Sequence, residues 1–178
     1  MKKTIFYTTI LILSLFAVTG YFTACKQDPC VTRDVDCRNG GTCKDGDCLC
    51  ALGYEGDSCQ FAVNKKFDSY YACIRTRITN GSLVEDNDDT LHVTALNDRF
   101  SIRLFSVRDS TFEVIDGKVD GNYVTIPEQT KDFIFYLATY TGNGSLNNGV
   151  LTITLFRSWV IGTTPMTSKT TYVGYKYE

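Results

Sequence analysis

The chain has very few of the residues that most enzyme sites require. Its 178 residues include one histidine, His92, which lies in the alternating segment 90–94. Nucleophilic catalysis needs a base beside the nucleophile, and the chain has no Gly-x-Ser-x-Gly motif. No spacing marks a pair of carboxylates for glycoside hydrolysis, and no glycine-rich phosphate loop joins a strand to a helix. We therefore expect a non-enzymatic protein with no catalytic residues and no cofactor, and we expect His92 to be a half-exposed strand residue.

Basic residues are also scarce. The chain has 18 lysines and arginines against 20 aspartates and glutamates, a net charge of −2. Without Lys2 and Lys3, which fall in a predicted export signal, 16 basic residues stand against 20 acidic ones, a net charge of −4. No basic patch favours nucleic acid as a partner. The acidic run 85–89 lacks the residue order of an EF-hand loop, so we expect a solvated turn there and no metal site.

The chain also lacks any segment in which apolar residues recur with the 3.6-residue period of a helix. Residues alternate instead with a period of two, and β-branched and aromatic residues are enriched in eight segments, which predicts eight strands. Turn signals separate them, and short strands at such spacing favour an antiparallel up-and-down barrel or sandwich. The expected strands are Tyr70–Ile78, Thr90–Leu96, Phe100–Val107, Thr111–Ile115, Tyr123–Ile126, Phe133–Tyr140, Val150–Phe156 and Thr171–Tyr177. The expected turns are Asn80-Gly81, Asp116-Gly117, Asp120-Gly121, Gly142-Asn143-Gly144 and Asn147-Asn148-Gly149.

Cysteine is plentiful, in contrast, and six of the eight cysteines lie between Cys30 and Cys59. So short a segment cannot bury enough apolar surface to hold a fold, so it needs disulfides or a metal ion. Zinc is disfavoured because Cys48 and Cys50 are too close together for its usual ligand spacing and His92 is far away. Six cysteines allow fifteen pairings, and the spacing does not choose among them.

The motif around these cysteines resembles an epidermal growth factor-like module. The resemblance rests on Cys37-x-Asn39-Gly40-Gly41-x-Cys43 and on the segment Cys48–Cys59, which carries Gly53-Tyr54-Glu55-Gly56. The asparagine and glycines suit the positive φ angles of sharp turns. The resemblance implies three disulfides, which pair Cys30 with Cys43, Cys37 with Cys48, and Cys50 with Cys59.

The N-terminus reads as an export signal. Lys2 and Lys3 precede the uncharged apolar run Ile5–Val18. The segment Phe22-Thr23-Ala24-Cys25 resembles a bacterial lipobox, which implies that Cys25 becomes the lipidated first residue. Ordinary cleavage after Ala24 is disfavoured because bulky Phe22 would occupy position −3. Ordinary cleavage after Gly20 and an uncleaved membrane anchor are the alternatives, although the apolar run is short for a span.

These patterns divide the chain into five parts. They predict a lipoprotein signal peptide over 1–24, a lipid-anchored tether over 25–29, a growth factor-like module over 30–59, a linker over 60–66 and an antiparallel β domain over 67–178. The membrane is then a partner through the lipid, and we expect an outer-membrane location on the periplasmic or the cell-surface face. Cys73 is left over, as a free thiol if Cys25 is lipidated or as its disulfide partner if it is not.

The β domain resembles the lipocalin-like domains of bacterial surface lipoproteins. The similarity lies in segments 119–127, 142–146 and 150–155. It implies an architecture and a location more than an activity. Such domains often pair a cysteine of the first strand with one near the C-terminus. Cys73 fits the first position, but residues 170–175 offer no partner.

Aromatic residues carry the remaining functional signal, because they line barrel mouths and stack on sugars. Trp159, at the end of a predicted strand, and Tyr140 are the candidate binding residues. The segment Phe133–Leu137 is apolar on both faces, as in a strand that is covered on each side. We expect an exported, lipid-anchored surface protein that presents a binding or adhesion surface to a protein or glycan. The alternative is a lipocalin-like carrier of a small apolar ligand.

Overall fold

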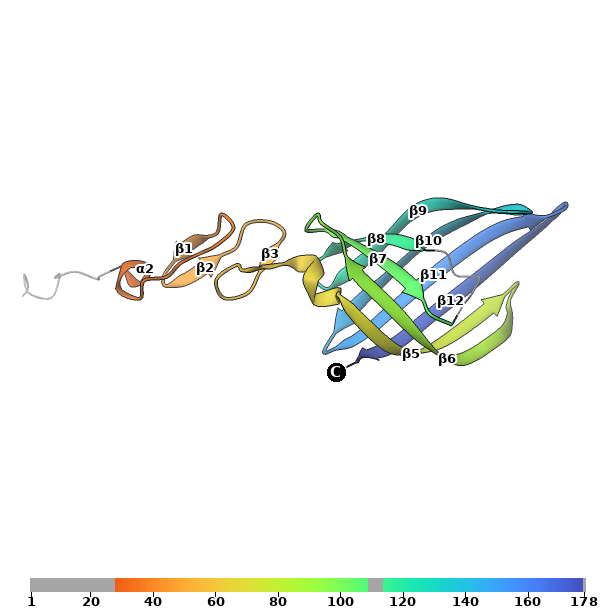
Figure 1. The fold of residues 1–178 in the computed structure, drawn as a ribbon, viewed down its shortest axis with the longest axis horizontal. Helices are drawn as coiled ribbons and strands as arrows, with labels where there is room; N and C mark the ends of the chain where they lie inside the picture. The colour runs from red at the N-terminus through yellow and green to blue at the C-terminus, as the bar shows by residue number, and fades with distance from the viewer. Residues whose placement is uncertain (1–27, 109–113, 178) are drawn as a thin grey trace, which may run out of the picture.

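The structure is a computed structural model that describes residues 28–108 and 114–177 (Figure 1). A small cysteine-rich module, residues 30–59, precedes a closed antiparallel β-barrel. Cys25 and the predicted export signal lie outside the described residues, as does most of the expected strand Thr111–Ile115. No helix among the described residues is long and apolar enough to cross a membrane.

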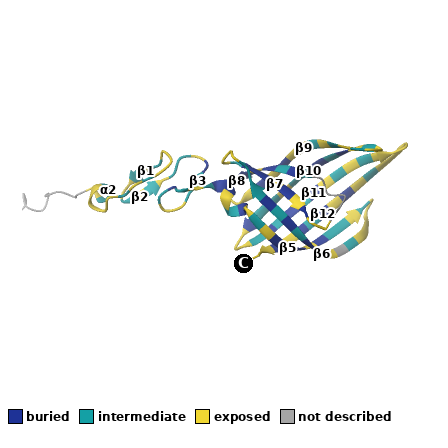
Figure 2. Ribbon diagram, viewed as in Figure 1, coloured by how far each residue is buried: buried dark blue, intermediate teal, exposed yellow. Residues whose placement is uncertain are grey.

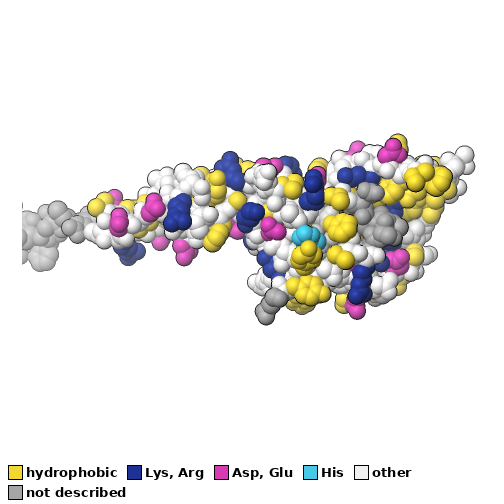
Figure 3. All heavy atoms as spheres, viewed as in Figure 1, with side chains coloured by type: hydrophobic (Ala, Val, Ile, Leu, Met, Phe, Trp, Pro, Cys, Tyr) yellow, Lys and Arg dark blue, Asp and Glu magenta, His cyan; other side chains and the backbone are white. Residues whose placement is uncertain are grey.

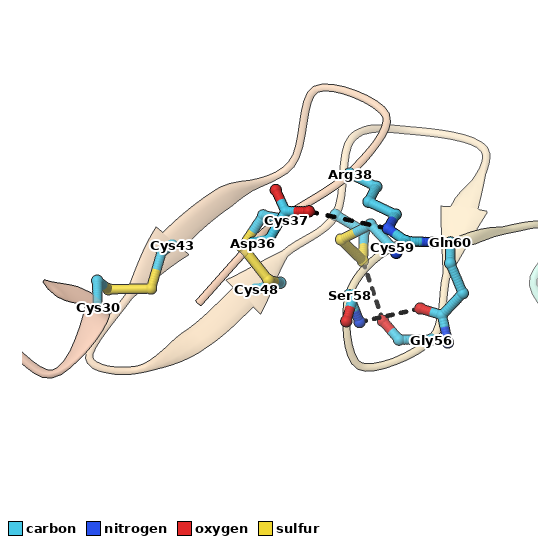
Figure 4. Close-up of a disulfide and its surroundings, with 11 residues drawn as sticks. Cys30, Asp36, Cys37, Arg38, Cys43, Cys48, Gly56, Ser58, Cys59 and Gln60 are labelled. Carbon is cyan, nitrogen blue, oxygen red and sulfur yellow. Dashed lines mark hydrogen bonds and ion pairs between the residues drawn. A yellow bond between two sulfur atoms is a disulfide. The ribbon is translucent and has the colours of Figure 1, made fainter. Parts of the chain in front are cut away.

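Three disulfides hold the cysteine-rich module together (Figure 4). They join Cys30 to Cys43, Cys37 to Cys48 and Cys50 to Cys59, the three pairs that the resemblance implied. A Cβ atom on Gly41 would stand 2.8 Å from Sγ of Cys59, so the chain needs glycine where it passes the last disulfide. The elements are α2 (Pro29–Thr32), β1 (Thr42–Lys44), β2 (Asp47–Leu49), β3 (Tyr54–Glu55) and β4 (Phe61–Ala62).

Eight consecutive strands form the barrel, and each pairs with the next. The last strand closes on the first, which settles the choice between barrel and sandwich. The up-and-down order puts the turns β5–β6, β9–β10 and β11–β12 at the barrel end that is farther from the module (Figure 1). The strands are β5 (Ser69–Thr79), β6 (Ser82–Ala95), β7 (Ser101–Ser106), β8 (Ile115–Asp120), β9 (Tyr123–Phe133), β10 (Tyr136–Asn147), β11 (Val150–Ile161) and β12 (Thr164–Lys176).

Apolar side chains fill the barrel at the end nearer the module, where buried positions alternate with exposed ones along each strand (Figure 2). A short 3₁₀ helix, η1 (Val63–Phe67), closes this end and buries Phe67 and Asn64 completely. The Asn64 amide donates hydrogen bonds to the carbonyl oxygens of Leu96, Asp98 and Ser101. These hydrogen bonds fasten η1 to the β6–β7 loop and to the start of β7.

The module meets the barrel through several contacts around η1. Val63 donates its backbone N–H to the carbonyl of Gly53 at 3.1 Å, and Lys66 forms an ion pair with Glu55 at 2.8 Å. The guanidinium of Arg99, in the β6–β7 loop, lies 5.0 Å from the ring centroid of Tyr54. Hydrogen bonds, charge and an aromatic contact therefore connect residues 53–55 to the closed end of the barrel.

Two of the expected turns are wrong. Gly142-Asn143-Gly144 lies inside β10, and Asp116-Gly117 lies inside β8. Cβ atoms on Gly142 and Gly144 would overlap carbonyl oxygens of the neighbouring strand β11. The glycines therefore allow a close approach of two backbones within the barrel wall, and they do not reverse the chain. The expected turns at 80–81, 120–121 and 147–149 are confirmed.

The expected strand Phe133–Tyr140 is wrong as well, because a turn divides it. β9 ends at Phe133 and β10 begins at Tyr136, and the side chains of Ile134 and Phe135 between them are 93% and 91% exposed. The apolar run therefore is not a strand covered on both faces. It places two uncovered apolar side chains at the far end of the barrel.

The acidic run is not a solvated turn. Residues 85–89 lie in β6, and Asp89 is buried inside the barrel. Arg75 of β5 forms ion pairs with Glu85 at 2.7 Å and with Asp89 at 3.0 Å. The inward carboxylates are tolerated because a guanidinium on the neighbouring strand compensates their charge.

Candidate binding site

The outer surface of β12, β5, β6 and β7 carries a continuous set of exposed aromatic and aliphatic side chains. Cross-strand register places Tyr70 beside His92, and His92 beside Phe105. The ring planes of Tyr70 and His92 are stacked, with centroids 4.0 Å apart. Figure 3 shows hydrophobic side chains gathered around the single histidine on this face. We call this surface the tyrosine face and define it by Tyr70, Ala72, Ile74, Thr90, His92, Phe105, Val173, Tyr175 and Tyr177.

A hollow of about 540 Å³ opens in the tyrosine face. Register places Ala72 between Tyr175 and Thr90, so small side chains lie at the centre of a surface whose other members are large. Tyr175 and Tyr177, which are 66% and 58% exposed, form part of the lining. Aromatic walls around a small floor suit a flat or branched group from another molecule.

Charged groups border the hollow at one end. Arg108 and Asp88 both belong to its lining, and the Arg108 guanidinium donates to the backbone carbonyl of Asp88 at 3.3 Å. The hollow therefore offers both signs of charge beside its apolar walls. Such a mixture favours a partner with polar groups around an apolar centre, as protein surfaces and sugars have.

The two candidate binding residues from the sequence lie elsewhere, inside the barrel at the end farther from the module. Tyr140 of β10 is buried, and Trp159 of β11 is partly buried against the core. Both rings face the guanidinium of Arg157, whose carbon lies 5.5 Å from the Tyr140 centroid and 4.6 Å from the Trp159 centroid. The structure thus brings these two residues together, but not on an exposed stacking face.

Cys73 is buried in β5 with 4% of its surface exposed. Burial raises the pKa of its thiol to about 11, so the reactive thiolate is scarce at neutral pH. Burial also raises the pKa values of Tyr71 and Tyr172 well above their usual range. These three groups lie in the barrel core and contribute to packing rather than to an accessible site.

Most of the tyrosine face was not predicted from the sequence. Tyr175 and Tyr177 alternate with smaller or charged residues at the C-terminal end, which is the available signal that they share one side of a strand. His92 lies in β6 and is partly exposed, as expected, but its stacking on Tyr70 depends on strand pairing, which a local pattern does not reveal. Among residues 28–108 and 114–177, no group of three or more histidine, cysteine or acidic residues is placed to hold a metal ion.

Comparison of the chain with protein-family models, curated proteins and solved structures finds no match. The chemistry of the exposed faces and of the barrel interior is therefore the available basis for a function.

Proposed function

We propose that this chain is an exported, lipid-anchored, non-enzymatic surface protein that binds a protein or glycan partner through the tyrosine face. The observation that carries the proposal is the 540 Å³ hollow at the centre of an exposed aromatic surface. The protein would be located at the outer membrane, and its cysteine-rich module would be an epidermal growth factor-like module.

Exposed aromatic residues on a sheet favour binding for a physical reason. Tyrosine has a large apolar ring that loses little conformational entropy when a partner covers it, and its hydroxyl keeps a polar contact. Four exposed aromatic side chains, Tyr70, Phe105, Tyr175 and Tyr177, lie on β5, β7 and β12 or directly after β12, and His92 lies between them on β6. Single exposed apolar residues are ordinary on a soluble protein, but a contiguous set of this kind marks an interaction surface.

The position of the cysteine-rich module supports the proposed binding role, because the module would act as a spacer between the anchor and the barrel. Figure 1 shows it extending from the closed end of the barrel toward the N-terminus. An anchor at Cys25 would then hold the membrane on the far side of the module from the barrel. The tyrosine face lies along the side of the barrel and would be open to a partner.

Variants of the tyrosine face test the binding proposal. We expect Tyr175→Ala to weaken binding about tenfold or more, because a central interface tyrosine often contributes that much. Ala72→Arg should have a similar effect by filling the hollow. Cells that display the full chain would be screened against a glycan array and immobilised extracellular-matrix proteins, and the variants titrated against each binder found.

Tyr123→Ala is the matched control, since Tyr123 is 71% exposed on β9, which is not one of the four strands of the tyrosine face. Its binding should equal that of the wild type, and all three variants should show unchanged melting temperatures. A binder whose affinity is the same for Tyr175→Ala, Ala72→Arg and the wild type would contradict the proposal.

The anchor is tested separately. Cys25→Ser removes the thiol that lipid attachment requires, so we expect the protein to appear in the soluble fraction or to keep its signal segment. Mass spectrometry of the wild-type N-terminus should find a lipidated Cys25. Cys73→Ser, which changes the other cysteine outside the module, should leave the anchor intact. A Cys25→Ser protein that stays in the membrane with an unchanged mature mass would exclude lipidation.

The alternative role, a carrier of a small apolar ligand, has less support. The barrel end near the module is filled by the side chains of its own strands and of η1. The far end combines partly buried rings with a charged group, so its chemistry is not purely apolar.

A further inference from the structure

The inner wall of the barrel becomes basic at the end farther from the cysteine-rich module, although the chain as a whole is acidic. Four basic residues share the inward face there by strand register: Arg75, Arg77, Lys131 and Arg157. The inward acidic residues of the described strands are Glu85 and Asp89. Positive charge therefore exceeds negative charge inside this end of the barrel.

The inward arginines differ in how their charge is balanced. Arg75 is paired with two carboxylates, and Arg77 lies 3.7 Å from Glu85. Arg157 has no carboxylate within ion-pairing distance among residues 28–108 and 114–177. Its guanidinium donates to the Tyr136 hydroxyl at 2.6 Å, and its Nε–H is buried with no acceptor. Its charge is thus not compensated by an acid of the described chain.

Aromatic rings surround this guanidinium. Its carbon lies 4.6 Å from the Trp159 centroid, 5.0 Å from that of Phe133 and 5.4 Å from that of Tyr136. Phe133 and Tyr136 are stacked with centroids 4.9 Å apart. Ring faces stabilise a cation, but they do not occupy the in-plane directions in which a guanidinium binds the two oxygens of a carboxylate.

The cluster lies at the far end of the barrel interior. Tyr140 is buried beneath it, whereas Arg157, Phe133, Tyr136 and Trp159 are only partly buried. Register places Trp159 and Met166 one step nearer to that end than Arg157. A ligand entering there would meet apolar side chains first and the guanidinium below them.

We propose that this end of the barrel binds a small organic carboxylate, with the carboxylate on Arg157 and the apolar body against Trp159 and Phe133. The apolar surroundings favour an organic anion over a strongly hydrated inorganic one, because only the organic anion covers the rings when it enters. The inference is independent of the tyrosine face, which lies on the outside of the barrel.

Trp159 makes the proposal directly measurable, since it is the only tryptophan in the chain. The full-length mature protein in neutral detergent micelles would be titrated with 3-phenylpropionate and with the uncharged 3-phenyl-1-propanol, and Trp159 emission recorded. We expect a saturable change with the carboxylate, at an affinity about tenfold or more above that of the alcohol, because a charge-assisted pair is worth that ratio.

Arg157→Gln should reduce the affinity for 3-phenylpropionate about tenfold and leave the alcohol unaffected. Lys169→Gln is the matched control: Lys169 lies beside Phe156 on the outer face of β12, so its loss removes one charge nearby without touching the interior. Arg157→Lys keeps the charge but not the two-pronged geometry, and it should bind with intermediate affinity. Arg157→Lys also provides the test of carboxylate binding if Arg157→Gln melts at a lower temperature than the wild type.

Three results would overturn the proposal. These are no saturable change in Trp159 emission with the carboxylate, equal affinities for the carboxylate and the alcohol, or unchanged affinity in both Arg157 variants. Each can occur whether or not the tyrosine face binds a partner, because the titration involves no cell surface and no macromolecule.

Discussion

Replacing Cys50 with serine should unfold residues 30–59 and leave the barrel folded. The Cys50–Cys59 disulfide lies where the module is most enclosed: Cys59 is completely buried, and its carbonyl accepts a hydrogen bond from the Asn39 side chain at 2.7 Å. The module has little apolar surface to bury, so the disulfides replace a core. Losing one bridge over so short a loop should cost about 2 to 3 kcal/mol, a large share of what so small a unit has.

The barrel should survive because its closure does not depend on that bridge. Phe67 and the hydrogen bonds of Asn64 belong to the barrel side of the junction. Hydrogen exchange measured by mass spectrometry should show lost protection over 30–59 and retained protection over β5–β12. Trp159 emission should report an unchanged unfolding midpoint for the barrel.

Cys73→Ser is the matched control, because it makes the same substitution inside the barrel. It should lower the midpoint of the barrel and leave protection of the module unchanged. If Cys50→Ser also lowers the unfolding midpoint of the barrel, the two parts do not unfold independently. The contacts of Lys66 and Arg99 then couple them into one cooperative unit.

The β class and most of the barrel strands could be predicted from the sequence because alternation and turn residues are local patterns. Asn80-Gly81 and Asn147-Asn148-Gly149 supply left-handed residues between alternating runs, and the structure shows positive φ at Asn80, Gly81, Asn148 and Gly149. Gly142 and Gly144 look similar in sequence, but neither of them has a positive φ angle in the structure. Their role is a close approach between two strands, which depends on the neighbouring strand and is invisible in a local pattern.

The candidate site was harder to predict for the same reason. Trp159 and Tyr140 could be chosen as aromatic residues, but their common contact with Arg157 comes from the pairing of β10 with β11. The tyrosine face likewise depends on closure of the barrel, because Tyr175 and Ala72 lie beside each other only after β12 pairs with β5. Residue type could single out the aromatic side chains, and non-local register decided where they lie.

The acidic run shows the same dependence on a non-local partner. Asp89 accepts hydrogen bonds from the Arg75 guanidinium at 3.0 Å, the Ser106 hydroxyl at 2.7 Å and the backbone N–H of Thr90. These donors come from three different strands, β5, β7 and β6. The carboxylate therefore holds three strands together in the middle of the barrel.

Asp89→Leu should destabilise the barrel by about 3 to 5 kcal/mol, because it removes one partner of a buried ion pair and leaves the charge of Arg75 less compensated. Chemical denaturation followed by Trp159 emission gives the change in unfolding free energy. The double variant Arg75→Met with Asp89→Leu removes both charges, so it should cost less than the sum of the two single variants.

An exposed ion pair serves as the comparison, because it shows how much stability is lost when a paired carboxylate is removed without burial. Arg103 and Asp116 lie 2.7 Å apart on the outer face of β7 and β8, each about half exposed, and the Arg103 hydrogen bond lowers the pKa of the Asp116 carboxyl. Asp116→Asn should cost less than about 1 kcal/mol at pH 7, because solvent screens the pair. This stability is present above the ordinary pKa of aspartate and is lost as the pH falls toward the lowered value. If Asp89→Leu costs no more than Asp116→Asn, the Arg75 network does not hold the barrel, and apolar packing alone maintains the inward acidic strand.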